Sequence, residues 1–184
     1  MPGSQKLPSI DVAYALYGKR WLLRAVFGAL VLTGCASAWR AGARRRWSVL
    51  TGIAATAAVT YAINFRMAAD HMFREPNVVD MQPAARNKVA LNRLVVGVSI
   101  NGEARAYPLQ FIGYHHQVAD RVGGDPVLVS YCTVCRTGRA FAPVIAGRLA
   151  TFRLVGMDHF NAMLEDRATG SWWRRSPTAT SAAP

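Results

Sequence analysis

The feature that most constrains the fold is a stretch of 19 residues without a charged side chain, at positions 47–65. At a rise of about 1.5 Å per residue, a helix of this length nearly crosses the roughly 30 Å hydrocarbon core of a membrane. A second apolar run, at positions 21–39, is interrupted only by Arg24, whose long side chain is close enough to one end to reach the interface. Hydrophobic residues make up 52% of the chain, which is high for a soluble protein. We therefore predict two transmembrane helices, and the alternative is a buried helix of a soluble protein.

Arginines between the two apolar runs predict the orientation of this helical hairpin. The cluster consists of Arg40, Arg44, Arg45 and Arg46. Because cationic loops are retained in the cytoplasm, we expect residues 40–46 on that side and everything after residue 66 outside. This describes a multi-pass protein of the inner (plasma) membrane with an extracytoplasmic C-terminal domain. Three further cations weaken the bias: Lys6, Lys19 and Arg20.

The formal net charge of +12 raises the question of a nucleic-acid partner. The densest basic cluster lies between two apolar runs, so membrane topology explains it better than nucleic-acid binding does. We therefore expect the lipid bilayer as a partner and no nucleic acid, and the sequence identifies no protein partner.

A second interpretation of the first apolar run concerns Cys35. The segment Leu32-Thr33-Gly34-Cys35 resembles a bacterial lipoprotein cleavage box. Cleavage there would attach a lipid to Cys35 and would place the C-terminal domain in the cytoplasm. Four-residue matches of this kind are common in helices rich in Ala, Gly and Leu, so we interpret Cys35 as a cysteine packed in a helix. A cleavable secretory signal is a further alternative.

The sequence changes character after residue 92, where short alternating runs are separated by turn residues. We predict four β-hairpins, over residues 94–107, 117–131, 139–154 and 162–173. Asn101-Gly102 in the first favours the positive φ angles of a two-residue hairpin turn. The predicted fold class is a mainly β, antiparallel domain preceded by an α-helical transmembrane hairpin.

The predicted organisation follows from these segments. Residues 1–20 form an N-terminal tail, residues 21–66 the two transmembrane helices, and residues 67–92 a linker without clear periodicity. Residues 93–173 form the β-rich domain. The tail at 174–184 is rich in Ser, Thr, Ala and Pro and is expected to be disordered.

The chemistry of the chain centres on Cys132 and Cys135, two of its three cysteines, which follow an apolar strand-like run. Two thiols at this spacing between strands can direct both sulfurs at one metal ion. Since zinc usually takes four ligands, we predict that His116 and His159 complete the site. The ion is Zn or Cu, and Met157 beside His159 would suit the softer Cu(I).

Two other interpretations of the cysteine pair stay open. A dithiol oxidoreductase usually carries this motif at the start of a helix, whose field lowers the first thiol pKa, but the residues after Cys135 do not resemble a helix. A structural disulfide in a non-catalytic module is permitted if the domain is extracytoplasmic. It has the same support as metal binding, and only the histidines favour the metal. His115 is a substitute for His116, because alternation in a strand would turn only one of the two toward the site.

Three blocks in order carry a family resemblance: the histidine-containing strand, the Tyr-Cys-x-x-Cys turn and a Glu-Asp-x-x-Thr-Gly-Ser-x-Trp block. Together they resemble the bacterial and archaeal family called domain of unknown function 3179, over residues 93–174. The family pattern falls on His116, Asp120, Gly123, Gly124, Tyr131, Cys132, Cys135, Thr137, Gly138, Asp166, Thr169, Gly170, Ser171 and Trp172.

The resemblance implies a fold unit and candidate residues but no reaction, so the sequence does not decide whether the protein is an enzyme. Family members commonly continue beyond the tryptophan block. The resemblance therefore also implies a shortened copy of the family domain.

Overall fold

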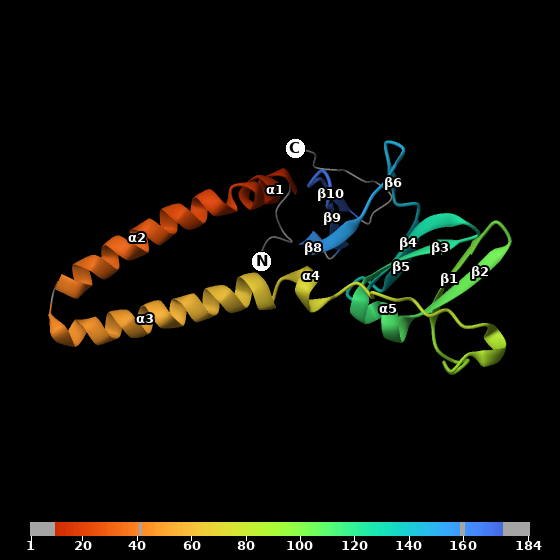
Figure 1. Ribbon diagram of the computed structural model, residues 1–184, viewed down its shortest axis with the longest axis horizontal. Helices are drawn as coiled ribbons and strands as arrows, with labels where there is room; N and C mark the ends of the chain where they lie inside the picture. The colour runs from red at the N-terminus through yellow and green to blue at the C-terminus, as the bar shows by residue number, and fades with distance from the viewer. Residues whose placement is uncertain (1–9, 41, 159–160, 175–184) are drawn as a thin grey trace. The chain divides into compact units, whose positions relative to one another are not determined.

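The computed structural model describes residues 10–40, 42–158 and 161–174. The chain divides into two compact units, a helical one over Leu7–His71 and a β-rich one that begins at Met72. Figure 1 shows the helices of the first unit and the strands of the second.

The helical unit is a hairpin of two long helices. Its elements are α1 (Ile10–Gly18), α2 (Arg20–Arg40), α3 (Ala43–Tyr61) and the π-helix η2 (Ala62–Arg66), and a short helix α4 (Ala69–Met72) follows. The predicted connecting loop at 40–46 was too long, because α3 already begins at Ala43. Alanine and arginine are good helix formers, so the arginines extend the helix. The bend falls beside Gly42, whose φ of 132° suits glycine.

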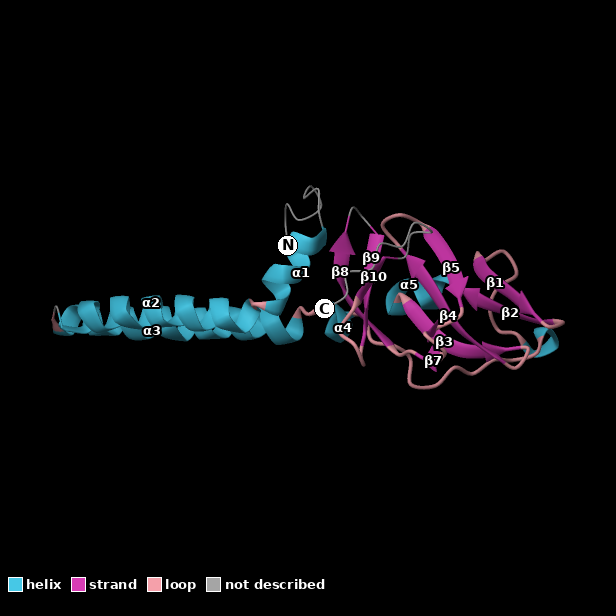
Figure 2. Cartoon of the chain, turned by 90° about the horizontal axis from the view of Figure 1, so that it is seen from above, coloured by secondary structure: helices cyan, strands magenta, loops and turns pink. Residues whose placement is uncertain are grey.

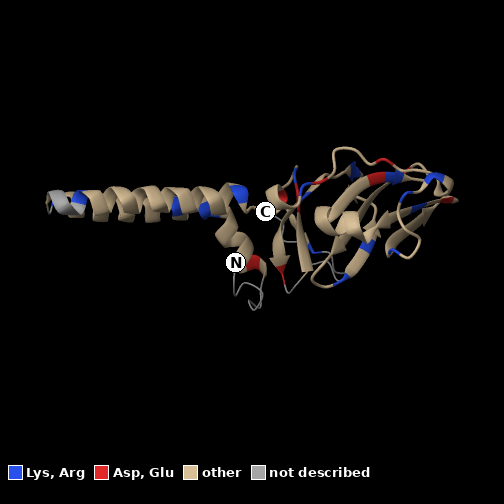
Figure 3. Ribbon diagram, turned by 90° about the horizontal axis from the view of Figure 1, so that it is seen from below, with Lys and Arg blue, Asp and Glu red and all other residues tan. Residues whose placement is uncertain are grey.

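Both long helices meet the length and hydropathy of a membrane span. The candidate spans are Arg20–Arg40 and Arg46–Arg66, of 21 residues each, and neither is buried against the rest of the described chain. Large apolar side chains stay exposed along them, including Trp21, Leu32 and Trp47. Lys and Arg residues lie toward the helix ends, and the middle of the hairpin carries none (Figure 3).

The β-rich unit is built from antiparallel strands in four small sheets (Figure 2). Its strands are β1 (Val95–Ile100), β2 (Glu103–Pro108), β3 (Gln117–Val122), β4 (Asp125–Cys132), β5 (Thr137–Phe141), β6 (Val144–Ile145), β7 (Arg148–Leu149), β8 (Phe152–Asp158), β9 (Asn161–Asp166) and β10 (Trp172–Arg174). A 3-10 turn η3 (Ala84–Arg86) precedes them, and helix α5 (Leu109–His115) joins β2 to β3. The predicted fold class, helices followed by antiparallel sheets, is confirmed.

Three of the four predicted hairpins are present. β1 pairs with β2, β3 with β4 and β9 with β10, each antiparallel. The third prediction was wrong in its strands, because the first half of that segment, β5, pairs with β4. Only the short pair β6 and β7 surrounds the predicted turn, and Pro143 separates it from β5. Proline has no backbone N–H to give to a ladder, so it ends the strand there.

Strand β4 is the centre of the domain because both of its faces are buried. One face, with Val127 and Val129, belongs to a core that also contains Val98, Tyr107 and Ile112. The opposite face carries Ser130 and Cys132, which are 0% and 2% exposed. Burial on both sides explains why this strand reads as an almost continuous apolar run.

Candidate thiol site

Cys132 is the last residue of β4, and Cys135 lies within the tight turn that leads to β5. β4 ends at Cys132, which pairs with Thr137 at the start of β5. Between them the backbone turns through Arg136, a non-glycine residue with a φ of 50°. The Thr137 hydroxyl donates to the Cys135 carbonyl at 3.0 Å and so closes the turn.

A hydrogen bond to sulfur shapes this turn. The backbone N–H of Cys135 donates to Sγ of Cys132 with an N···S distance of 3.5 Å. Neither residue forms a disulfide, and both are thiols. The bond holds the Cys132 sulfur against the backbone of the turn.

The two thiols differ in their access to solvent. Cys132 is buried at 2% exposure, whereas Cys135 is half-buried. A ligand or reagent would therefore reach the pair from the Cys135 side. One sulfur is thus held inside the domain, and the Cys135 side of the pair meets solvent.

Gly138 allows the strand after this turn to pack closely. A Cβ atom at this position would lie 2.7 Å from Cγ2 of Val96. The absence of a side chain here lets β5 approach β1.

His116 lies beside the same turn, held by the residue before Cys132. Its Nδ1 is 2.9 Å from the carbonyl oxygen of Tyr131. A carbonyl can only accept, so Nδ1 carries the hydrogen and the neutral ring presents its lone pair at Nε2. This is the usual way in which a metal-binding histidine is oriented. Phe73 packs edge-on against the ring, with centroids 4.3 Å apart.

The local backbone explains this position and corrects the expected strand. His115 is the last residue of α5, and His116 follows in the left-handed region with a φ of 62°. Alternation across a strand therefore does not separate the two side chains. His115 bonds instead to the Arg74 carbonyl through Nδ1, at 2.5 Å.

The predicted ligand set is only partly described. His159 lies outside the described residues. Within residues 10–40, 42–158 and 161–174, no group of three or more His, Cys, Asp or Glu side chains is arranged to hold a metal ion. The structure thus brings Cys132 and Cys135 together and ties His116 to the residue before Cys132.

The element that follows the cysteine pair bears on the dithiol oxidoreductase interpretation. β5 begins at Thr137, so a strand and not a helix follows Cys135. The helix N-terminus that lowers a thiol pKa in thioredoxin-like sites is absent from this described turn. This finding speaks against the oxidoreductase interpretation.

A second polar cluster surrounds Asp120, which sequence reasoning singled out only through the family pattern. Nη1 of Arg105 lies 2.7 and 2.8 Å from its two carboxylate oxygens, and the Tyr107 hydroxyl donates to one of them at 2.8 Å. Glu103 accepts from Nε of Arg105 at 2.7 Å and from the N–H of Gly123 at 2.7 Å. The cluster fastens β2 to β3 and to its turn.

These contacts change the acidity of the cluster. Burial raises the pKa of Asp120, but the hydrogen bonds from Tyr107 and Arg105 outweigh it, so the pKa lies below its ordinary value. Burial, followed by the bond to Asp120, raises the pKa of Tyr107. Asp120 is therefore an anion at neutral pH, and Tyr107 stays protonated.

The β8–β9–β10 sheet contains buried carboxylates that the sequence did not reveal. Glu165 accepts from Nε of Arg153 at 2.7 Å and from Nε1 of Trp172 at 3.0 Å. Asp166 is fully buried and accepts from the Thr169 hydroxyl at 2.8 Å. Both of these adjacent carboxylates are buried, and each has cationic or polar donors. These hydrogen bonds stabilise the sheet and the turn before β10.

A protein-family model described as "Protein of unknown function (DUF3179)" matches residues 73–182. The match begins before the predicted β-rich segment, and Val79 and Met81, which lie in this earlier part, pack against the domain core. No curated protein and no solved structure matches the chain.

Proposed function

This chain belongs to the family of proteins of unknown function DUF3179, and from the geometry of its cysteine turn we propose that it is a membrane-anchored domain binding a thiophilic metal ion. The ligands are Cys132 and Cys135 together with His116 and His159. The ion is Zn²⁺ or Cu⁺, the two that thiolate and imidazole ligands favour.

The observation that carries this proposal is the N–H···S bond from Cys135 to Cys132 inside a closed turn. It ties the Cys132 sulfur to the backbone of Cys135 within one short turn before any ion arrives. A turn that is already closed loses little conformational freedom on binding, which raises affinity.

The orientation of His116 supports the same function. With Nδ1 committed to the Tyr131 carbonyl, the nitrogen left for a ligand is Nε2. Cys132 comes directly after Tyr131, so the hydrogen bond joins the histidine to the cysteine turn.

Membrane anchoring is the second part of the proposal. A helix that is apolar on all sides must bury its whole surface, either in a protein core or in lipid. Neither long helix is buried in the described chain, so we propose that the bilayer surrounds both. The arginines at the bend support a cytoplasmic location for the bend and an extracytoplasmic one for the β-rich domain, because cationic loops resist translocation.

Metal content tests the site directly. The full chain is purified in detergent, supplied with Zn²⁺ or with Cu⁺ under reducing conditions, and desalted. We expect one bound ion per chain, a complete loss in Cys132→Ser and Cys135→Ser, and an affinity at least about tenfold lower in His116→Ala. Cys35→Ser is the matched control, because it removes a thiol from α2 and should keep the ion.

Two results would contradict the metal proposal. One is a wild-type chain that retains neither ion, and the other is a Cys132→Ser variant that retains as much bound ion as Cys35→Ser. Thiol titration of the same samples would then separate the remaining interpretations, a disulfide or a reduced dithiol.

A further inference from the structure

A basic loop with exposed leucines leads up to the first strand of the domain. We define it as residues 82–94. It contains three cations, Arg86, Lys88 and Arg93, and no acidic residue. Leu91 is 98% exposed and Leu94 is 74% exposed. Cations interleaved with solvent-exposed leucines are not explained by the fold of the domain.

The basic loop has a defined local structure. The side chain of Asn87 bonds both backbone groups of Val89, at 2.9 Å each. The N–H of Arg93 donates to the Ala90 carbonyl at 3.0 Å, so Leu91 lies in a closed turn.

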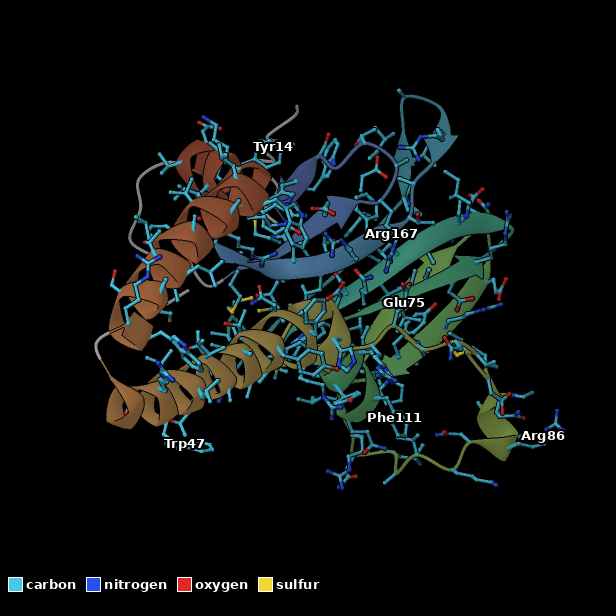
Figure 4. The ribbon with its side chains drawn as sticks, turned by 60° about the vertical axis from the view of Figure 1, so that its left-hand side comes forward. Tyr14, Trp47, Glu75, Arg86, Phe111 and Arg167 are labelled. Atoms are coloured by element: carbon cyan, nitrogen blue, oxygen red, sulfur yellow. The ribbon has the colours of Figure 1, made fainter. Side chains whose placement is uncertain are left out.

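Both ends of the loop are fixed to the domain. Met81 packs against the core just before the loop, and β1 begins at Val95 directly after it. Figure 4 shows Arg86 at the outer edge of the domain, away from the strands. The loop therefore presents its cations and leucines to whatever lies outside the domain.

The chemistry of the loop selects an anionic lipid surface as its occupant. Cations near such a surface gain electrostatic attraction, and adjacent leucines gain by entering the boundary between headgroups and acyl chains. An acidic protein would satisfy the cations but would leave the leucines in water. Chain connectivity also keeps lipid close, since residues 67–72 between the second apolar helix and the domain span at most about 20 Å.

We infer that the basic loop docks the domain onto anionic phospholipid through Arg86, Lys88, Arg93 and Leu91. This inference rests on the membrane anchoring proposed above, and it adds a second, peripheral contact with the bilayer. Docking holds the domain against the membrane surface instead of leaving it free to rotate on its tether.

Accessibility of position 91 tests the inference. The full chain carrying Leu91→Cys is placed in nanodiscs of phosphatidylcholine alone or of phosphatidylcholine mixed with phosphatidylglycerol. A water-soluble maleimide is added, and labelling at this position is followed by peptide mass. We expect labelling about fivefold slower or more with the anionic lipid, and the difference should disappear at high salt.

Two variants make the outcome decisive. Ala168→Cys, exposed in the turn before β10, should label at the same rate in both nanodiscs. Adding Arg86→Gln, Lys88→Gln and Arg93→Gln to Leu91→Cys should restore fast labelling. Equal rates for Leu91→Cys in the two lipids would overturn the docking inference while the chain still co-purifies with the nanodisc. A chain that stays outside the nanodisc would overturn the anchoring, and the docking with it.

Discussion

At the scale of single residues, Asp120 joins strands through charge as well as hydrogen bonding. Its carboxylate is 12% exposed and faces Arg105, which is 27% exposed. Neither side chain is fully hydrated, so each charge depends on the other for its stabilisation. Removing one charge would leave its partner poorly solvated, which is costly in proteins.

We therefore expect Asp120→Asn to destabilise the domain by about 2 kcal/mol at neutral pH, because hydrogen bonds to charged groups contribute about 1.5–3 kcal/mol. For a domain of this size, that lowers Tm by about 10 °C. Near-ultraviolet circular dichroism of the full chain in detergent measures it. Asp80→Asn, which changes an exposed carboxylate, should leave Tm almost unchanged.

The pH dependence of this difference has a definite sign. The pKa of Asp120 is lower in the folded protein than in the unfolded chain, so its contribution is complete above the unfolded value of about 3.9. It is lost as pH falls from there through the folded value. The gap in Tm between wild type and Asp120→Asn should shrink at about pH 3. Equal Tm values at neutral pH would contradict the role given to this carboxylate.

At the scale of elements, the close approach of β5 to β1 depends on Gly138. A methyl group there would meet Cγ2 of Val96 at 2.7 Å. Valine has few rotamers with which to move away. An added methyl group at position 138 would therefore push β5 and β1 apart and strain their packing.

Gly138→Ala should cost about 1–3 kcal/mol, the usual penalty for overpacking. Shortening the opposing side chain should relieve it, so Val96→Ala combined with Gly138→Ala should be more stable than the sum of the single changes predicts. Gly97→Ala is the control, because a Cβ there meets nothing within 4 Å. Thermal unfolding of the four variants gives the coupling. Simple additivity would show that the strands separate without penalty.

Local signals account for the elements that the sequence predicted. Asn101-Gly102 and Gly123-Gly124 adopt positive φ angles, and both hairpins formed around them as expected. Helix α5 was not predicted, because seven residues are too few to display a helical period. The pairing of β5 with β4 was missed because it depends on where a proline interrupts an apolar run.

The candidate site was predictable to the same limited extent. The spacing of Cys132 and Cys135 predicted a shared turn, which is what the chain forms. The bond of His116 to Tyr131 could not be predicted, because it depends on a left-handed residue after an unpredicted helix. The buried state of Glu165 depends on Arg153 and Trp172, which are distant in sequence or on another strand.

At the scale of the whole molecule, the connection between α2 and α3 determines the topology. The helices follow one another with a bend at Gly42, so a chain that crosses the bilayer twice returns to the side on which it began. The N-terminal segment and the β-rich domain would then share one side.

Reporter fusions after Arg46 and after Pro108 test this topology. We expect a cytoplasmic readout from the first and an extracytoplasmic readout from the second, because the arginines at the bend resist translocation. Cys35→Ser should leave both readouts unchanged. A cytoplasmic readout from the Pro108 fusion would instead support lipid attachment at Cys35.

The contacts of His116 have one more consequence, for how β4 can pair. Both backbone groups of Tyr131 form hydrogen bonds with this histidine. The Tyr131 N–H donates to the His116 carbonyl at 2.9 Å, and the Tyr131 carbonyl accepts from the ring. Sliding β4 past β3 by one residue would break both bonds at once. Such slippage would turn Cys132 from the face of the strand that it shares with Ser130 to the face that carries Val127 and Val129. His116 therefore fixes the register of the β3–β4 hairpin. Because His116 follows the last residue of α5, the direction of the Cys132 sulfur depends on where that helix ends.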